Sequence, residues 1–378
     1  MFSAKPIAVF PLILLIAAMA ACGGGTSTTT NPQSPTNPQP PGGAVWQKVN
    51  TPSAVTQLNY VAFNSSNHWF IADRNNGFYR STDQGATWTQ INSGLTTTLG
   101  WTINVNPANG DLIASTYSGT VINANPVNFY RSTDEGNSWN VIPSGQLSAA
   151  TAQTGCVFAA NSDLVCGGYW APFPNSGAWV STNGGQTTIS ASTASTIGGS
   201  VYGLGLNPVT QDLWLGTEQN GILRSANNGL NWTVESPPAT SFDPVHGIRD
   251  GNIYGMTFDN NGNVLFGSQG GIWKSSKTGT GYTWTNVLQN QNTAAGKGLG
   301  RDAHGNLYYG HNHDANDPTV VYRSIDNGST WSAYDSGIPP SLEGHEFIVN
   351  PADRKLYAVI EDGVTNNGWL YGTVNPVQ

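Results

Sequence analysis

The chain has few charges and lacks the pattern that marks helical proteins. Charged residues make up 10% of its 378 residues, and 14 Lys and Arg stand against 22 Asp and Glu, for a formal net charge of −8. No run of basic residues occurs, so the sequence predicts no nucleic-acid partner. No stretch of useful length has the apolar period of an amphipathic helix. The sequence is therefore unlike a DNA- or RNA-binding protein and unlike a helical bundle.

Residues that favour turns and strands are abundant instead. The chain contains 46 Gly, 13 Trp and 14 Tyr. Glycine favours tight turns, and aromatic side chains favour pleated, partly buried strands. This composition indicates an all-β fold.

A short apolar segment lies near the N-terminus. Lys5 supplies a positive charge, and Ile7–Ala18 is almost wholly apolar. A run of about a dozen residues is too short to span a bilayer but fits a signal peptide. The segment from Met19 to Cys22 then resembles the lipobox of bacterial lipoprotein precursors, with Met19 where Leu is usual. The resemblance implies a signal peptide over residues 1–21 and a lipid on Cys22; the alternative is an ordinary secretory signal with Cys22 unmodified.

The segment that follows has the composition of a linker. Gly23–Gly43 is made almost wholly of Gly, Ser, Thr, Asn, Gln and Pro. It cannot bury enough apolar surface to offset its ordering entropy, so residues 22–43 are predicted to be a disordered tether behind the lipid. Gly23 stands where inner-membrane lipoproteins usually have Asp. The resemblance therefore implies an exported protein whose partner is a membrane, anchored at the cell envelope, in the outer membrane or at the cell surface.

Only three cysteines occur, which limits the disulfides that can form. With Cys22 lipidated, Cys156 and Cys166 remain as a pair in an oxidising compartment. They flank the turn at Asn161–Asp163, on what should be adjacent antiparallel strands. A disulfide is predicted, with two buried thiols as the alternative.

The strongest signal is an internal repeat, Ser-x-Asp-x-Gly-x-Thr-Trp. Complete copies begin at Ser81, Ser132 and Ser324, and degenerate copies begin at Ser181, Ser225 and Ser275, at intervals of 44 to 51 residues. Asp or Asn with Gly two residues later forms a tight turn with side-chain-to-backbone hydrogen bonds, and the Trp begins the next strand. The predicted structural residues of these turns are Asp83, Asp134, Asn183, Asn227, Asp326, Trp88, Trp139, Trp232, Trp284 and Trp331.

Each copy follows three predicted strands, so one period holds four antiparallel strands, which is one blade of a β-propeller. The last three strands, near Glu346–Asn350, Lys355–Ile360 and Trp369–Val374, have no fourth strand after them. Ala44–Asn50 looks like an orphan fourth strand. If it completes the last blade, residues 44–378 form a single seven-bladed propeller without a free edge, closed by an N-terminal strand. Six blades are the alternative.

The repeat resembles the Asp-box, or BNR, repeat of sialidases and their non-sialidase relatives, over nearly the whole folded part. The resemblance implies that the repeat turns are scaffold. It also implies that ligands bind on the opposite face, made by the loops between strands two and three and those that lead into the next blade.

The loops of that face carry polar residues and four of the six histidines. Convergent carboxylates, imidazoles and exposed aromatic rings suit a glycan ligand, although polar loop residues also gather on any solvated face. His311 and His313 are two residues apart, but no third ligand is defined, so no metal and no cofactor are predicted. The candidate ligand-binding residues are His246, Arg249, His311, His313, Asp314, Glu343, His345, Glu361, Asp73, Arg74, Glu218, Tyr169 and Trp170.

Sialidase activity is not expected, because the resemblance is confined to scaffold motifs. A sialidase needs three substrate-binding arginines, and the only arginines outside the repeat turns are Arg74, Arg249, Arg301 and Arg354. The Phe/Tyr-Arg-Ile-Pro motif of the family is absent.

Two classes of function remain open. The segment Asp73–Arg80 is similar to the Asp-x-Gly-Gly-Ala-Tyr-Arg segment of xyloglucanase-type hydrolases, but those enzymes take their second carboxylate from a second propeller. Polysaccharide lyases of this fold use His, Tyr and Arg, which His246, His311, Tyr169 and Arg249 could supply. Other propellers of the type, similar to photosystem assembly factors and sortilin, bind proteins or peptides. We predict a monomeric, non-catalytic binding module for glycan or protein ligands, with a glycan-active enzyme as the alternative.

Overall fold

A computed structural model gives the structure of the protein and describes residues 45–116, 128–142, 152–169, 178–183, 185, 189–190, 201–217, 221–235, 253, 255–268, 271–279, 281–289, 298–311 and 317–377. All of them belong to one compact unit, Pro35–Gln378. The predicted signal peptide, Cys22 and the tether lie outside the described residues. Within these residues, no helix is long and apolar enough to cross a membrane.

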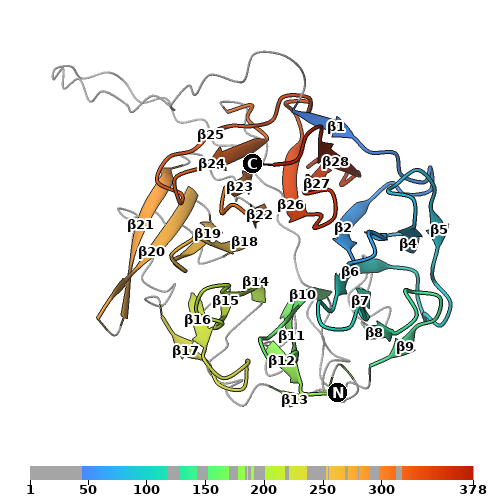
Figure 1. Ribbon diagram of the computed structural model, residues 1–378, viewed down its shortest axis with the longest axis horizontal. Helices are drawn as coiled ribbons and strands as arrows, with labels where there is room; N and C mark the ends of the chain where they lie inside the picture. Colours follow the sequence, from blue (N-terminus) through green and yellow to red (C-terminus); the bar gives the residue numbers. More distant parts are fainter. Residues whose placement is uncertain are drawn as a thin grey trace, which may run out of the picture. The chain divides into compact units, whose positions relative to one another are not determined.

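The described chain forms seven four-stranded antiparallel sheets, arranged as the blades of a β-propeller (Figure 1). Blades 1 to 3 contain β2 (Leu58–Phe63), β3 (Trp69–Asp73), β4 (Gly77–Ser81), β5 (Thr89–Gln90); β6 (Gly100–Val105), β7 (Leu112–Thr116), β8 (Phe129–Ser132), β9 (Asn140–Val141); and β10 (Ala152–Phe158), β11 (Leu164–Tyr169), β12 (Ala178–Ser181), β13 (Ile189–Ser190).

Blades 4 to 6 follow the same order, with the first strand of each blade nearest the centre of the ring (Figure 1). They contain β14 (Val201–Leu206), β15 (Leu213–Thr217), β16 (Ile222–Ser225), β17 (Thr233–Val234); β18 (Gly255–Phe258), β19 (Val264–Ser268), β20 (Gly271–Thr278), β21 (Gly281–Gln289); and β22 (Gly298–Arg301), β23 (Leu307–Gly310), β24 (Val321–Ser324), β25 (Ser332–Ala333).

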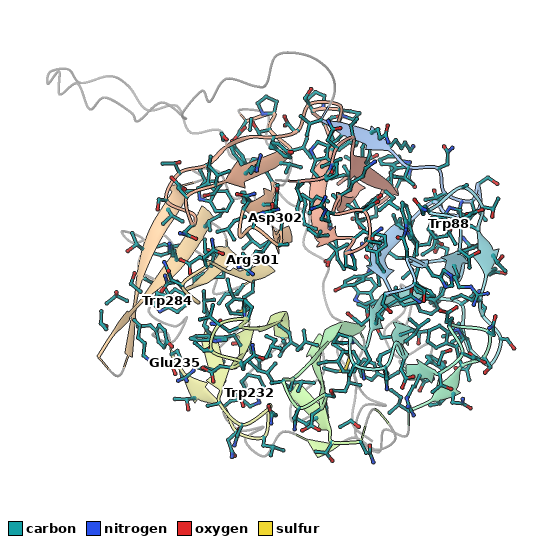
Figure 2. All side chains as sticks on the ribbon, viewed as in Figure 1. Trp88, Trp232, Glu235, Trp284, Arg301 and Asp302 are labelled. Carbon is teal, nitrogen blue, oxygen red and sulfur yellow. A yellow bond between two sulfur atoms is a disulfide. The ribbon has the colours of Figure 1, made fainter. Side chains whose placement is uncertain are left out.

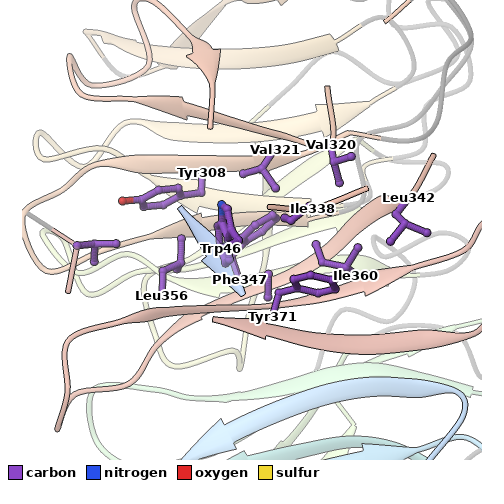
Figure 3. Close-up of a cluster of buried hydrophobic side chains, with 12 residues drawn as sticks. Trp46, Tyr308, Val320, Val321, Ile338, Leu342, Phe347, Leu356, Ile360 and Tyr371 are labelled. Carbon is purple, nitrogen blue, oxygen red and sulfur yellow. The ribbon is translucent and has the colours of Figure 1, made fainter. Parts of the chain in front are cut away.

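Blade 7 joins the two ends of the propeller. Its strands are β26 (Glu343–Val349), β27 (Leu356–Glu361), β28 (Gly368–Thr373) and β1 (Trp46–Lys48), in the sheet order β1-β28-β27-β26. The Trp46 side chain is buried against Phe347 and Tyr334, and its Nε1 donates to the Tyr334 carbonyl at 2.6 Å. Figure 3 shows this ring among side chains of blades 6 and 7. The predicted seven-bladed ring, closed by an N-terminal strand, is confirmed.

The repeat turns join the third and fourth strands of their blades. In the first copy the Gly85 N–H donates to Ser81 Oγ at 2.8 Å, and Thr87 N–H donates to Asp83 Oδ1 at 2.8 Å. These hydrogen bonds lower the pKa of Asp83 to about 2, because they favour its ionised form. The copies at Ser132 and Ser324 have the same bonds to the matching Gly, Ser or Thr residues.

The Trp residues of the repeat lie away from the centre of the ring, as Figure 2 shows for Trp88, Trp232 and Trp284. The copy at Ser275 departs from the others, because its inserted residues extend a hairpin in place of the turn. Ser275 and Trp284 are direct cross-strand partners in β20 and β21. The Ser275 hydroxyl instead accepts the Val264 N–H, at 2.7 Å.

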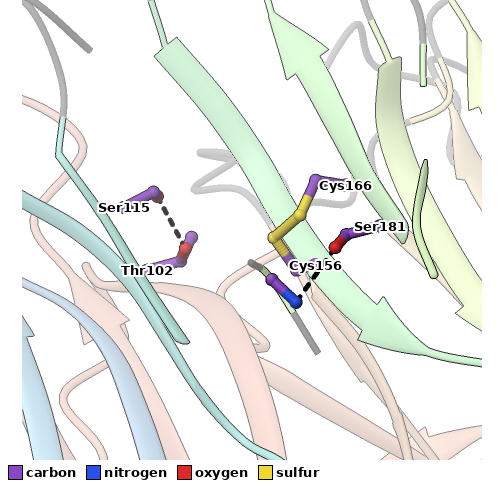
Figure 4. Close-up of a disulfide and its surroundings, with 6 residues drawn as sticks. Thr102, Ser115, Cys156, Cys166 and Ser181 are labelled. Carbon is purple, nitrogen blue, oxygen red and sulfur yellow. Dashed lines mark hydrogen bonds between the residues drawn. A yellow bond between two sulfur atoms is a disulfide. The ribbon is translucent and has the colours of Figure 1, made fainter. Parts of the chain in front are cut away.

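Cys156 and Cys166 are cross-strand partners in β10 and β11 and form a disulfide (Figure 4). Both residues lie in a buried cluster formed by side chains of blades 2 and 3. Of the two arrangements left open by the sequence, the structure has the disulfide.

Removing this disulfide should cost stability because it closes a loop in the unfolded chain. The cysteines are 10 residues apart. We expect the Cys156→Ala, Cys166→Ala protein to unfold with a free energy lower by about 2–3 kcal/mol, since loops of this size contribute about that much. Chemical denaturation of both proteins, with and without reductant, measures the difference. Wild-type stability that does not change on reduction would contradict the prediction.

Candidate functional site

A β-bulge occurs at the same place in the inner strands of five blades. The register skips one residue near the start of β2, β6, β10, β14 and β26. The extra residues are Asn59, Trp101, Thr154, Tyr202 and His345. A bulge turns its side chain out of the regular pleat, and bulges are common beside binding sites. The bulges of blades 7, 1 and 2 contribute His345, Asn59 and Trp101 to one polar cluster.

Arg74 connects three blades at the end of the propeller where the inner strands begin. It follows β3 directly, and its guanidinium donates to Asn59 Oδ1 at 2.8 and 3.0 Å. The same group donates to Glu361 Oε1 of blade 7 at 2.8 Å and lies over the Trp101 ring of blade 2, 5.1 Å from its centroid. The Asn59 amide in turn donates to the Trp101 carbonyl at 2.6 Å. Arg74 is thus held in one orientation by partners from blades 1, 2 and 7.

His345 lies between two carboxylates of its own blade. Its Nε2 is 3.4 Å from Glu343 Oε2, and its Nδ1 is 3.4 Å from Glu361 Oε2. Glu343 and Glu361 are direct partners in β26 and β27, and both are buried. Gly363 leaves the room for this, because a Cβ there would lie 2.1 Å from Glu343 Oε1. We call Asn59, Arg74, Trp101, Glu343, His345 and Glu361 the inner cluster.

A third acidic residue, Glu346, directly follows His345 in β26. Tyr60 of β2 hydrogen-bonds to the Glu346 carboxyl, across the interface between blades 1 and 7. Burial raises the pKa of Glu346 to about 7, since a desolvated carboxylate is unfavourable, and the hydrogen bond from Tyr60 opposes this rise. Sequence reasoning missed Glu346. Its signal was a lone acidic residue directly before the apolar run Phe347–Val349.

Asp73, a predicted ligand-binding residue, has a structural role. It is fully buried, and Oδ2 accepts the backbone N–H groups of Thr56 and Gln57 at 3.0 and 2.8 Å. Its Oδ1 accepts the backbone N–H groups of Asn75 and Asn76 and the Asn76 amide, at 2.8 to 3.0 Å. Five N–H donors therefore occupy the carboxylate. Asp73 holds the turn that positions Arg74.

His311 lies next to the inner cluster through its backbone, since its carbonyl accepts the Gly344 N–H at 3.3 Å. Its side chain is buried between the rings of Tyr309 and Tyr322, and its Nδ1 is 3.1 Å from the Thr319 carbonyl. Of the candidates from the sequence, the structure brings together Arg74, Glu343, His345 and Glu361. Six others lie outside the described residues, as does the side chain of Tyr169: His246, Arg249, His313, Asp314, Glu218 and Trp170.

No metal centre is defined by the part of the chain that the structure describes. Those residues contain no group of three or more His, Cys, Asp or Glu side chains that could hold a metal ion. The carboxylates and the imidazole of the inner cluster instead contact one another and Arg74.

The fold places the chain in the class of seven-bladed β-propellers with four-stranded antiparallel blades. No family model matches the sequence. The chain is 25% identical over 345 residues to a xyloglucanase from Paenibacillus sp., a match that covers 76% of this chain and 32% of that protein. The chain thus spans about a third of the length of this curated relative.

Solved structures show the same fold at lower identity. YCF48 from Cyanidioschyzon merolae is similar with a TM-score of 0.60 and 16% identity, over 87% of this chain and 99% of that one. Virginiamycin B lyase from Staphylococcus aureus has a TM-score of 0.62 and 14% identity, over 87% and 99%. The GH74 enzyme of Niastella koreensis has a TM-score of 0.60 and 17% identity, over 86% and 55%. These similarities concern the fold alone.

Proposed function

We propose that the chain is a glycan-binding propeller whose ligand site is the inner cluster. The observation that carries the proposal is the convergence of Arg74, His345 and Trp101 from three blades, each held in place by neighbouring side chains or strands. Sugars are recognised by polar groups in fixed positions together with an aromatic surface, and the inner cluster has both. The similarity to a protein named xyloglucanase supports a glycan as the ligand.

The carboxylates of the site favour binding over hydrolysis. A glycoside hydrolase needs two carboxyl groups that flank the bond to be cleaved. Glu361 is held by Arg74 and His345, and Glu343 faces the same imidazole. Asp73, which matches the hydrolase-like segment, is occupied by five N–H donors. We therefore propose a binding module without hydrolytic activity.

One observation favours a second function, proton-transfer chemistry on a glycan. Glu346 has a pKa raised to about 7 and hydrogen-bonds to Tyr60, one residue along the strand from His345. A carboxyl group that titrates near neutral pH can both accept and donate a proton. A polysaccharide lyase would require such a pair, with Arg74 beside the substrate's carboxylate.

Binding of xyloglucan oligosaccharides by calorimetry tests the proposal. We expect saturable binding by the wild-type protein and an affinity about ten- to a hundredfold lower for Arg74→Gln, because the contacts of one charged donor contribute about 1.5–3 kcal/mol. Arg354→Gln is the matched control, since Arg354 is exposed in the turn before β27, at the other end of that strand from Glu361. Assays for reducing ends follow the same mixtures, and unsaturated sugars are assayed in separate mixtures with a uronate-containing polysaccharide, because a lyase needs a carboxylate that xyloglucan lacks.

Three outcomes separate the functions. Binding without new products supports the binding module, whereas unsaturated products that disappear in Glu346→Gln support the lyase. A folded wild-type protein that binds neither xyloglucan nor any other glycan on an array would exclude the inner cluster as a glycan site.

A further inference from the structure

Blade 7 differs from five other blades at one strand position. In blades 1, 2, 4, 5 and 6 the third strand carries a long cation directly before the first Ser of the repeat, and this cation is paired in register with the second strand. These residues are Arg80, Arg131, Arg224, Lys274 and Arg323. In blade 7 the matching residue is Gly372, paired with Tyr357. A Cβ at Gly372 would lie 2.7 Å from the Tyr357 ring.

Blade 7 also lacks the acidic residue with which this cation pairs in two other blades. In blades 2 and 4 the Arg forms an ion pair with the Asp directly before the second strand, Asp111 at 2.6 Å and Asp212 at 2.7 Å. The residue directly before β27 in blade 7 is Lys355. No ion pair within the described residues includes Lys355. Blade 7 thus carries a positive charge where these two blades carry a negative one.

The absence of the cation also changes the interface between blade 7 and blade 1. We call the interface between two neighbouring blades a seam. At two other seams the cation donates to the backbone of the neighbouring repeat turn, from Arg80 to the Glu135 carbonyl at 2.9 Å and from Lys274 to the Asn327 carbonyl at 2.6 Å. Gln84 holds this turn position in blade 1 and faces blade 7, where Gly372 has no side chain to reach it. A pocket of about 370 Å³ lies there.

The lining of this seam pocket suits a small acidic sugar. Lys355 offers an ammonium group, and Gln84 and Asn50 offer amides. Asp353 is oriented by the Tyr357 hydroxyl at 2.7 Å and the Lys355 backbone N–H at 2.9 Å, and can accept from a ligand hydroxyl. Trp69 and Tyr357 form aromatic walls. The volume is at the small end of the range for ligand pockets, which is the size of about one sugar ring.

We propose that the seam pocket binds a uronic-acid sugar, with its carboxylate on Lys355 and its hydroxyls on Asp353 and Gln84. This site is distinct from the inner cluster. Trp69 and Arg74 lie at opposite ends of β3, and Tyr357 and Glu361 lie at opposite ends of β27. The pocket therefore opens at the end of the blades that carries the repeat turns, and the proposal does not depend on a glycan at the inner cluster.

Titration of the full chain with sodium glucuronate, followed by tryptophan fluorescence and calorimetry, tests the proposal. We expect saturable binding, and affinity about tenfold lower for glucose, which has the same ring without the carboxylate. Lys355→Gln should raise the Kd for glucuronate about tenfold, because a charge-assisted hydrogen bond is lost. Lys277→Gln, at an exposed position in the β20–β21 hairpin, should not change it.

A second variant guards against a loss of stability in Lys355→Gln, and a second ligand distinguishes a free sugar from a glycan end. If Lys355→Gln melts at a lower temperature than the wild type, Gln84→Ala replaces it, since Gln84 is an exposed residue on the other wall. A glucuronate-terminated disaccharide that binds more tightly than glucuronate assigns the pocket to glycan ends, and equal binding assigns it to the free sugar. Equal affinities for glucose and glucuronate, or no saturable binding of either acidic ligand at millimolar concentration, would overturn the proposal.

Discussion

Replacement of Asp73 by alanine is expected to lower the free energy of unfolding by about 3–5 kcal/mol, because the change leaves several N–H donors without an acceptor. The carboxylate is fully buried and accepts four backbone N–H groups and the Asn76 amide. Denaturation in urea, followed by tryptophan fluorescence, measures the loss. Asn75→Ala, in the same turn but with an exposed side chain, should change the stability by less than about 0.5 kcal/mol.

The asparagine variant distinguishes the structural part of Asp73 from a catalytic one. Asp73→Asn keeps one oxygen acceptor but turns an N–H₂ group toward backbone donors, so it should also be destabilised. A hydrolytic carboxylate would behave differently, because its replacement usually leaves stability unchanged and removes activity. An Asp73→Asn protein as stable as the wild type would therefore contradict the role assigned here and would favour a hydrolase.

The architecture could be predicted from the sequence because the repeat marks one blade at a time. The orphan segment around Trp46 predicted the closing strand, and the structure pairs that strand with β28. The copy at Ser275 was harder to interpret, since residues that usually form a turn continue a hairpin once the spacing grows. Spacing within the motif therefore determines the turn as much as its residue types do.

The candidate site could be predicted only in part, because side-chain partners depend on register. Loop position placed Arg74, His345 and Glu361 among the candidates, and in the structure Glu361 contacts both Arg74 and His345. It could not show that Asp73, one residue before Arg74, faces five N–H donors. The seam pocket is visible only when Gly372 is aligned with Arg80 and its equivalents through strand pairing.

The stability of the protein should depend on pH through Glu346. Burial raises its pKa from an ordinary value of 4.5 to about 7 in the folded protein. Between these values the folded state binds more protons than the unfolded state, so stability falls as pH rises through this window and is constant above it. A difference of this size corresponds to about 3 kcal/mol at full effect.

Glu346→Gln should remove this dependence, because an amide keeps an acceptor for the Tyr60 hydroxyl without a charge. We expect the variant to be more stable than the wild type by up to about 3 kcal/mol at about pH 8, and nearly equal to it at about pH 5. Urea denaturation at the two pH values measures both differences. An effect of equal size at both would mean that Glu346 does not titrate in this window, and the proton-transfer function would lose its support. A gain confined to the higher pH would show that Glu346 titrates in this window and that its ionised form is destabilising, as the proton-transfer function requires.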